Sequence, residues 1–148
     1  MIKRALPDQA DLLSGIALAS KAHWGYDDEF LTRFASVIGI TPEYLRQNDV
    51  WVLEEAGELA GFYGLLDRGE TCELDHLWLL PEFIGKGLGR VLFEHALVRA
   101  GELGARRLEW EAEPNAVGFY EQMGGRVVGE TAGQLGRPLP VMARQVGA

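Results

Sequence analysis

The sequence predicts an α/β fold in which helices flank a mixed, mostly antiparallel sheet. Short apolar runs alternate with stretches of helical periodicity along its 148 residues. In the middle of the chain, three strand-like runs follow one another through short turns, which is typical of antiparallel pairing. The remainder of the chain then alternates helix, strand, helix and two strands. A mixed sheet covered by helices is therefore expected.

The N-terminal part is expected to form one short strand and three helices. The strand ends at Pro7, and two stretches with helical spacing of apolar residues follow it. Thr41 and Pro42 then place a capping residue before a proline at the first helical position. The expected elements are a strand over 2–6 and helices over 8–22, 27–38 and 42–47.

Three strands are expected in the middle of the chain. The first two are joined by EEAGE, in which Gly57 suits a tight hairpin turn. The second and third are joined by the turn DRGE. The expected strands cover residues 50–54, 59–66 and 72–80.

The clearest helix of the chain is predicted over 88–103. Its apolar residues recur mostly at spacings of three and four, and Gly104 lies where a left-handed cap would end it. A shorter helix is expected to begin near Pro114 and to end at Gly124. The remaining predicted elements are this helix, over 113–123, and strands over 107–111, 126–130 and 139–144.

Composition limits the class of protein. The length suits one domain over residues 1–148. A balance of 14 basic against 22 acidic residues gives a formal charge of -8, which argues against a nucleic-acid partner. The single cysteine, Cys72, excludes an internal disulfide and a multi-cysteine metal site, and no histidine pair forms a metal motif. Because neither a signal peptide nor a membrane span is apparent, we expect a soluble, cytoplasmic protein.

A glycine-rich bend precedes the long helix. Gly85, Gly87 and Gly89 let the backbone turn sharply and approach a ligand, while the first amides of the helix have no partner. The helix dipole, Lys86 and Arg90 add positive charge, so the bend is a candidate phosphate site. A turn without a ligand is the alternative.

The spacing of the bend argues against two common nucleotide motifs. A P-loop needs Ser or Thr after its lysine, but Gly87 follows Lys86. A dinucleotide fingerprint needs Gly-x-Gly-x-x-Gly, and Arg90 or Leu92 stands where the third glycine would be. A nucleotide-binding enzyme is therefore disfavoured.

Two motifs resemble those of the GNAT superfamily of N-acetyltransferases. LWLLPEFIGKGLGRVL is similar to the family's strand, proline turn and Arg/Gln-x-x-Gly-x-Gly/Ala helix start, with Gly87 and Gly89 at the glycine positions. EPNAVGFYEQMGG resembles the second motif, an Asn before a helix that carries Phe-Tyr and ends in glycine. The chain departs from the pattern at Ile84, where the family usually has Arg or Gln. The resemblance covers about residues 50–130 well and the first helices loosely.

The resemblance implies that the cofactor is acetyl-CoA. It implies that the strand over 72–80 parts from the strand over 107–111 and leaves a wedge for pantetheine. Backbone amides there would also polarise the thioester carbonyl. The resemblance also implies that Asn115 helps to bind the cofactor; the alternative is a polar residue in a first helical turn. The cofactor-binding residues so implied are Gly85, Lys86, Gly87, Leu88, Gly89 and Arg90 for the pyrophosphate, Leu77 and Leu79 for pantetheine, and Asn115.

Two proton transfers remain: a base or a water chain must take a proton from the amine, and the departing thiolate gains from a nearby acid. Tyr120 matches the family's tyrosine and is the candidate acid for the departing thiolate, the alternative being a core aromatic. For the base we expect Glu73 first and Asp75 second, because strict alternation places both on one strand face with Leu77 and Leu79. A solvated strand start is the alternative for both. His76 would face the other way unless a bulge intervenes.

The stretch HWGYDDEF is the candidate substrate-binding segment. Trp24 and Tyr26 lie beside three acidic residues, a composition that suits a cationic amine through charge and cation–π contact. Packing of both rings on the core is the alternative.

The sequence therefore favours an acetyl-CoA-dependent N-acetyltransferase whose acceptor is a primary amine of a small molecule or peptide that attacks the thioester directly. The alternative is a catalytically weak acyl-CoA-binding or regulatory domain of the same fold. No metal, nucleic-acid or membrane partner is expected. The oligomeric state is left open, with a homodimer as one option.

Overall fold

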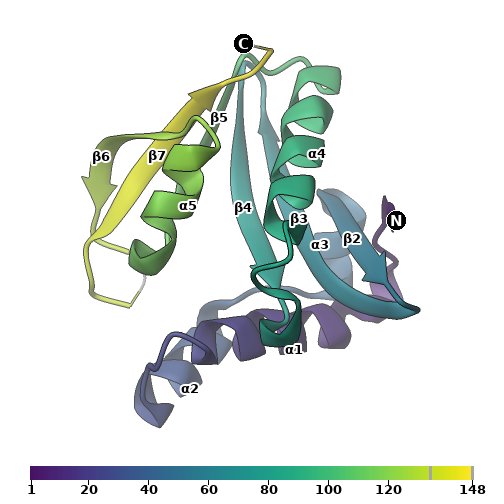
Figure 1. Ribbon diagram of the computed structural model, residues 1–148, viewed down its shortest axis with the longest axis vertical. Coiled ribbons are helices and arrows are strands. Elements are labelled where there is room, and N and C mark those ends of the chain that lie inside the picture. The colour runs from purple at the N-terminus through teal and green to yellow at the C-terminus, as the bar shows by residue number, and fades with distance from the viewer. Residues whose placement is uncertain (134, 148) are drawn as a thin grey trace.

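The computed structural model describes residues 1–133 and 135–147 and contains a seven-stranded sheet flanked by helices (Figure 1). The strand order is β1-β2-β3-β4-β5-β7-β6, and every neighbouring pair is antiparallel except β4 and β5. The predicted fold class, a mixed and mostly antiparallel sheet with helices around it, is confirmed.

The elements follow the order that apolar periodicity predicts. The strands are β1 (Ile2–Arg4), β2 (Asp49–Glu55), β3 (Glu58–Arg68), β4 (Thr71–Leu79), β5 (Arg107–Glu111), β6 (Arg126–Thr131) and β7 (Leu139–Gln145). The helices are α1 (Ala10–Ala22), α2 (Asp28–Val37), α3 (Pro42–Gln47), α4 (Leu88–Glu102) and α5 (Val117–Gln122), with single 3₁₀ turns at Pro7–Gln9, Pro81–Phe83 and Pro114–Ala116. The capping prediction for α3 is confirmed, because the Thr41 hydroxyl accepts a hydrogen bond from the Tyr44 amide at 3.0 Å.

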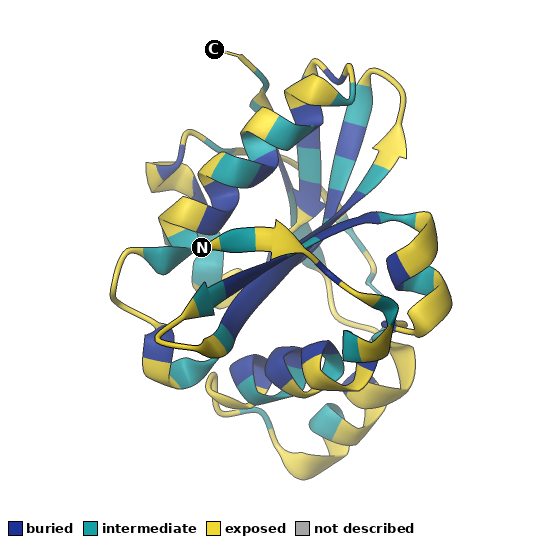
Figure 2. Cartoon of the chain, turned by 90° about the vertical axis from the view of Figure 1, so that its right-hand side faces the viewer, coloured by how far each residue is buried: buried dark blue, intermediate teal, exposed yellow. Residues whose placement is uncertain are grey.

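Each face of the sheet has its own apolar core, as the pattern of buried residues in Figure 2 shows. The helices α4 and α5 cover one face, where Phe93 and Tyr120 pack against Trp110 of β5. The helices α1, α2 and α3 cover the other face, where Leu13 and Phe34 join Phe62 of β3. The N-terminal helices and the long helix therefore lie on opposite sides of the sheet.

The parallel strands β4 and β5 pair only at their beginnings. Thr71, Cys72 and Glu73 pair with the first residues of β5, and the pairing stops after Glu73 and Glu109. From Leu74 onward, the edge of β4 that faces β5 has no strand partner among the described residues. The two strands thus part as they approach the glycine bend.

A β-bulge changes which residues of β4 share a face. Gly64 of β3 pairs with His76, but the next residue pairs with Leu74, so Asp75 is an extra residue in β4. The expectation that Glu73 and Asp75 share a face with Leu77 and Leu79 is therefore wrong. The two leucines pack toward α4 and α5.

On the other side of the bulge, Glu73 lies on the same face as His76 and Trp78, toward the N-terminal helices. The physical reason is that one inserted residue shifts the two-residue alternation of the strand by one position.

Candidate active site

A cleft of about 480 Å³ opens where β4 and β5 part. It continues from the space between the strands to the glycine bend and to the start of α5. It brings together most of the residues that the sequence predicts for the cofactor, namely Leu77, Leu79, Gly85, Gly87, Gly89, Arg90 and Asn115, with Tyr120 beside them. The predicted wedge is thus present as a cavity.

The glycine bend presents main-chain groups to this cleft. Gly85 and Gly87 have φ values of +84° and +80°, a conformation that favours glycine. Gly87 is the N-cap of α4 and supplies no side-chain hydrogen bond, so the first helical amides are open to a ligand. A Cβ added at Gly89 would lie 3.1 Å from the Phe119 ring, so this glycine lets the helix start pack closely on α5.

The side chains of three residues near the bend add no charge or hydrogen-bonding group to the cleft. Lys86 points away, with its Nζ 5.6 Å from the centre of the Phe83 ring. Leu88 packs on the apolar core and does not line the cleft. Ile84 does line it, with an apolar side chain where an arginine or glutamine would supply hydrogen bonds. Anion binding here depends on the main chain and on Arg90.

Tyr120 is a buried ring that also borders the cleft. It lies 5.0 Å from Trp110 and 5.9 Å from Phe93, measured between ring centroids. Burial, and then the charge of Glu113, raise the pKa of its hydroxyl. The hydroxyl therefore stays protonated at neutral pH, which is the form that can donate a proton.

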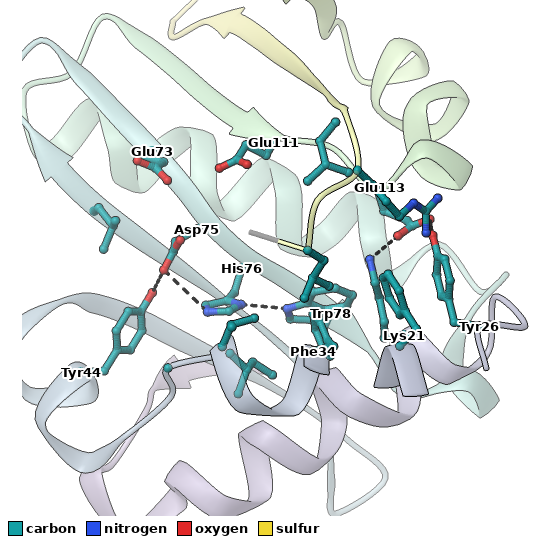
Figure 3. Close-up of a pocket in the computed structure, with 18 of the residues that line it drawn as sticks. Lys21, Tyr26, Phe34, Tyr44, Glu73, Asp75, His76, Trp78, Glu111 and Glu113 are labelled. Atoms are coloured by element: carbon teal, nitrogen blue, oxygen red, sulfur yellow. Dashed lines mark hydrogen bonds and ion pairs between the residues drawn. The ribbon is translucent and has the colours of Figure 1, made fainter. Parts of the chain in front are cut away.

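A second pocket of about 490 Å³ lies on the other side of the parted strands (Figure 3). Its walls come from α1, α2, α3, β3, β4, β5, the segment before β7 and the first residue of β7. The two pockets share five lining residues, which mark the passage between them: Asp75, His76, Trp78, Glu111 and Glu113. A group held in one pocket can therefore reach a group held in the other.

Three carboxylates face this second pocket from the sheet. Glu73 is held by Arg68 at 3.1 Å and lines only the second pocket. Asp75 accepts a 2.6 Å hydrogen bond from the Tyr44 hydroxyl. Glu111 lies in the passage, and no hydrogen bond or ion pair holds its carboxylate in the described part of the chain.

Glu111 differs from the other carboxylates in its electrostatic environment. Burial, followed by the negative charges of Glu73 and Asp75, raises its pKa above the ordinary value. An unpaired carboxylate with a raised pKa is a typical proton acceptor in an enzyme site. The sequence analysis missed this residue. A signal was present in EWEAE, where alternation places Glu109, Glu111 and Glu113 on one face just before the Asn115 motif.

Glu113 anchors the N-terminal helices to the end of β5. It forms a buried ion pair with Lys21 and accepts hydrogen bonds of 2.7 Å from the Tyr26 hydroxyl and from the Asn115 side chain. Burial alone would raise its pKa, but the bonds from Lys21 and Tyr26 outweigh that effect and lower it. Glu113 is therefore a charged structural link between the two pockets.

His76 is buried and is held in one orientation. Its Nδ1 accepts a hydrogen bond from the Trp78 indole at 2.9 Å, and its Nε2 lies 3.6 Å from Asp75. Burial lowers its pKa, and the contacts with Asp75 and the Ile38 backbone offset only part of that effect. The ring is therefore neutral near pH 7.

The predicted substrate residues divide between the two pockets. Tyr26 lines the second pocket, but Trp24 lines the cleft beside β4 and is 38% exposed. Neither ring is a fully buried core residue. The turn after α1 therefore directs the two rings to different cavities, and a substrate role for either ring stays a prediction.

In the described ranges, 1–133 and 135–147, no group of three or more His, Cys, Asp and Glu side chains is placed to hold a metal ion. Over the same ranges, no helix combines the length and the hydropathy that a membrane crossing requires.

The fold and the two connected pockets are typical of a group-transfer enzyme, in which a donor and an acceptor must meet. The sequence model described as the acetyltransferase (GNAT) family matches residues 18–125. The chain belongs to this family and is an N-acetyltransferase, so the resemblance seen in its two motifs is confirmed.

Relatives support this assignment. The peptidyl-lysine N-acetyltransferase YjaB of Salmonella typhimurium is 34% identical over 105 residues, which are 70% of this chain and 68% of the relative. YjaB of Escherichia coli is 37% identical over 67% of this chain, and the match spans 65% of that relative. The 5-NmdU N-acetyltransferase of Pseudomonas phage PaMx11 is 26% identical over 94% of this chain and 96% of its own length.

Solved structures share the fold over almost the whole chain. A GCN5-related N-acetyltransferase from Rhodopseudomonas palustris has a TM-score of 0.83 at 20% identity and covers 98% of this chain and 94% of its own. The PaiA N-acetyltransferase from Thermoplasma acidophilum, solved in complex with coenzyme A, has a TM-score of 0.81 at 20% identity, with 98% of each chain covered. At this identity the likeness shows the fold.

Proposed function

We propose that this protein transfers the acetyl group of acetyl-CoA to a primary amine of a small molecule or peptide, by direct attack of the amine on the thioester. The observation that carries the proposal is the passage at the parted ends of β4 and β5, where the donor cleft meets the acceptor pocket. Solved neighbours that contain coenzyme A support the choice of donor.

In this proposal acetyl-CoA lies in the cleft with its pyrophosphate at the glycine bend and its thioester at the passage. The amides from Gly85 to Arg90 receive the pyrophosphate, because the helix start offers unpaired N–H donors and positive dipole charge. The pantetheine arm lies along Leu77 and Leu79, on the edge of β4 that β5 leaves open. Asn115 borders the same cleft. The thioester then reaches the passage, where a backbone amide of β4 polarises its carbonyl.

The amine must lose a proton before or as it attacks. Three carboxylates are candidates for this role: Glu73, Asp75 and Glu111. The geometry favours Glu111 over Glu73, because Glu111 borders both pockets and has no ion-pair partner in the described residues, whereas Glu73 is held by Arg68. Its raised pKa also makes it a better proton acceptor than an ordinary carboxylate.

Tyr120 is the proposed proton donor to the departing thiolate. The amine nitrogen forms the new bond to the acetyl carbon as the carbon–sulfur bond breaks, and the sulfur takes the proton of the hydroxyl. Tyr120 borders the donor cleft and stays protonated because burial raises its pKa.

For the acceptor, the observations support a chemical class, an amine, and not a particular molecule. YjaB is named for peptidyl-lysine, which supports an amine of a peptide, and the size of the acceptor pocket also suits a small amine. The cytoplasmic location and a homodimer stay predictions from the sequence.

The test combines two measurements. Thiol release from acetyl-CoA is followed across a panel of small amines and lysine peptides, and coenzyme A binding is measured by calorimetry. We expect binding and amine-dependent thiol release. Binding without release on any amine would support a weak acyl-CoA-binding domain instead, the alternative that Ile84 motivates. Absence of binding would overturn both proposals.

A further inference from the structure

The charged side chains around the acceptor pocket are unevenly distributed. Glu73, Asp75 and Glu111 lie toward one end, where Arg68 pairs with Glu73. Lys21 lies with Tyr26 at the other end, where Glu113 pairs with Lys21, as Figure 3 shows. Arg137, which follows β6, lines the Lys21 end. An amine that approaches the three carboxylates would therefore direct the rest of its structure toward Arg137, since Glu113 already balances Lys21.

The aromatic rings at the Lys21 end are already in contact with cations of this chain. Tyr26 and Phe30 stack on each other with ring centroids 4.2 Å apart. The Lys21 ammonium lies 5.0 Å from the Tyr26 ring, and the Arg137 guanidinium lies 4.9 Å from it. A cationic substrate that stacked on these rings would meet like charge. The expectation that Tyr26 attracts an ammonium by cation–π contact is therefore disfavoured.

The two cations differ in how they are balanced. Lys21 forms a buried ion pair with Glu113. Arg137 forms no ion pair with a carboxylate in the described part of the chain, and its side chain is exposed to the pocket. Nearby, Arg33 of α2 donates a 3.0 Å hydrogen bond to the Leu135 carbonyl. This bond ties the segment before β7 to α2, so that Arg137 is placed at the pocket wall.

We infer that Arg137 binds an anionic group of the acceptor, so that the acceptor carries a primary amine and a carboxylate at opposite ends of the pocket. This inference rests on the proposed function. The planar guanidinium matches a carboxylate through two parallel hydrogen bonds, and the rings below hold it in position. The amine of the same molecule then lies beside Glu111.

The carboxylate can belong to a small amino acid or to an acidic residue next to lysine in a peptide. Both sources present the same chemistry, and two matched pairs of substrates distinguish them. The first pair is γ-aminobutyrate or δ-aminovalerate against the corresponding amide. The second pair is a blocked Lys-Glu dipeptide against a blocked Lys-Gln dipeptide.

The experiment measures the ratio of kcat/KM within each pair for the wild type and for Arg137→Gln. We expect the carboxylate to be preferred by about five- to tenfold in the wild type, as for an exposed but charge-assisted contact. Arg137→Gln should bring the ratio close to one, and a general loss of folding would not change it. Arg46→Gln is the matched control, because Arg46 on α3 is exposed outside the pocket. It should keep the wild-type ratio.

The outcomes separate this inference from the proposed function. A preference in only one of the two pairs identifies the source of the carboxylate. Equal rates in both pairs, or a ratio that survives Arg137→Gln, would overturn the inference while the acetyltransferase activity stands. Absence of thiol release with every amine would overturn the proposed function, and the inference with it.

Discussion

The donor cleft and the acceptor pocket meet at the same point of the sheet, but the groups proposed to bind in each differ in kind. The donor cleft relies on main-chain amides and glycines from one stretch of chain, around Gly87. In this proposal the acceptor pocket relies on charged side chains from α1, β3, β4 and β5 and from the loops that follow β5 and precede β7. Main-chain binding depends on backbone shape, whereas side-chain binding depends on which groups carry charge. Substitutions in the two regions should therefore impair the function of the protein in different ways.

The largest expected effect comes from Glu111 in the passage. Glu111→Gln keeps the size of the side chain but removes the proton acceptor, so kcat should fall about a hundredfold. Coenzyme A affinity should change little, because the cofactor is bound by main-chain groups. Steady-state kinetics and calorimetry on the same preparation check both statements.

Glu109→Gln is the matched control for this variant. Glu109 lies two residues earlier on β5, is paired with Arg107 at 2.6 Å and lines neither pocket. It should retain nearly full turnover. If Glu111→Gln retained turnover while Glu73→Gln lost it, the base would be Glu73 and not Glu111.

The next effect concerns the proposed acid. Tyr120→Phe keeps the ring packing on Trp110 and Phe93 but removes the hydroxyl, so kcat should fall about tenfold with little change in coenzyme A affinity. Tyr63→Phe deletes a buried hydroxyl that contacts His95 and lines neither pocket. Equal kcat losses in the two variants would remove Tyr120 from the acid role.

A smaller effect is expected in the main-chain site. Gly87→Ala places a Cβ at a φ of +80° beside the open helix start, so coenzyme A affinity should fall about five- to tenfold. Gly69→Ala introduces similar backbone strain, at a φ of +86°, in the turn between β3 and β4, away from the cleft. Both variants should lose stability, but calorimetry should show weaker binding only for Gly87→Ala. Equal affinities would place the phosphates elsewhere.

The two regions also differ in what the sequence can predict. The glycine bend is local: its residues are consecutive, and alternating glycines before a helix with regular apolar spacing indicate an anion site from pattern alone. The helices and strands were predictable for the same reason, because their apolar periodicities are local. Spacing cannot show that the Lys86 side chain lies near the Phe83 ring, so a phosphate contact from Lys86 stays a prediction.

The acceptor pocket could not be predicted to the same extent, because its geometry depends on contacts between distant segments. The bulge at Asp75 is visible only in the pairing of β4 with β3. Lys21 lies in a helix whose pattern gives no reason to expect burial, yet Glu113 holds it 92 residues away. The importance of Glu111 depends on where β5 parts from β4, which no local pattern reveals.

The smallest expected effect is on stability and again concerns Glu111. Burial, with Glu73 and Asp75, raises its pKa above the ordinary value of 4.5 in the folded state. The folded state therefore binds this proton more tightly, and stability falls as pH rises from the unfolded pKa through the folded one. Below both values the group is neutral in either state. Glu111→Gln should therefore leave the Tm unchanged near pH 4 and raise it by about 1 °C near pH 7.5.

Thermal unfolding at the two pH values checks this sign, with Glu109→Gln as the control. Glu109 is paired with Arg107, so its substitution should not raise the Tm at neutral pH. A Tm gain at neutral pH in the variant that also loses turnover would mean that the charge at Glu111 is unfavourable to the fold and is kept for the reaction. A lower Tm at neutral pH would instead show that the carboxylate stabilises the fold, and its assignment as the unpaired base would fail.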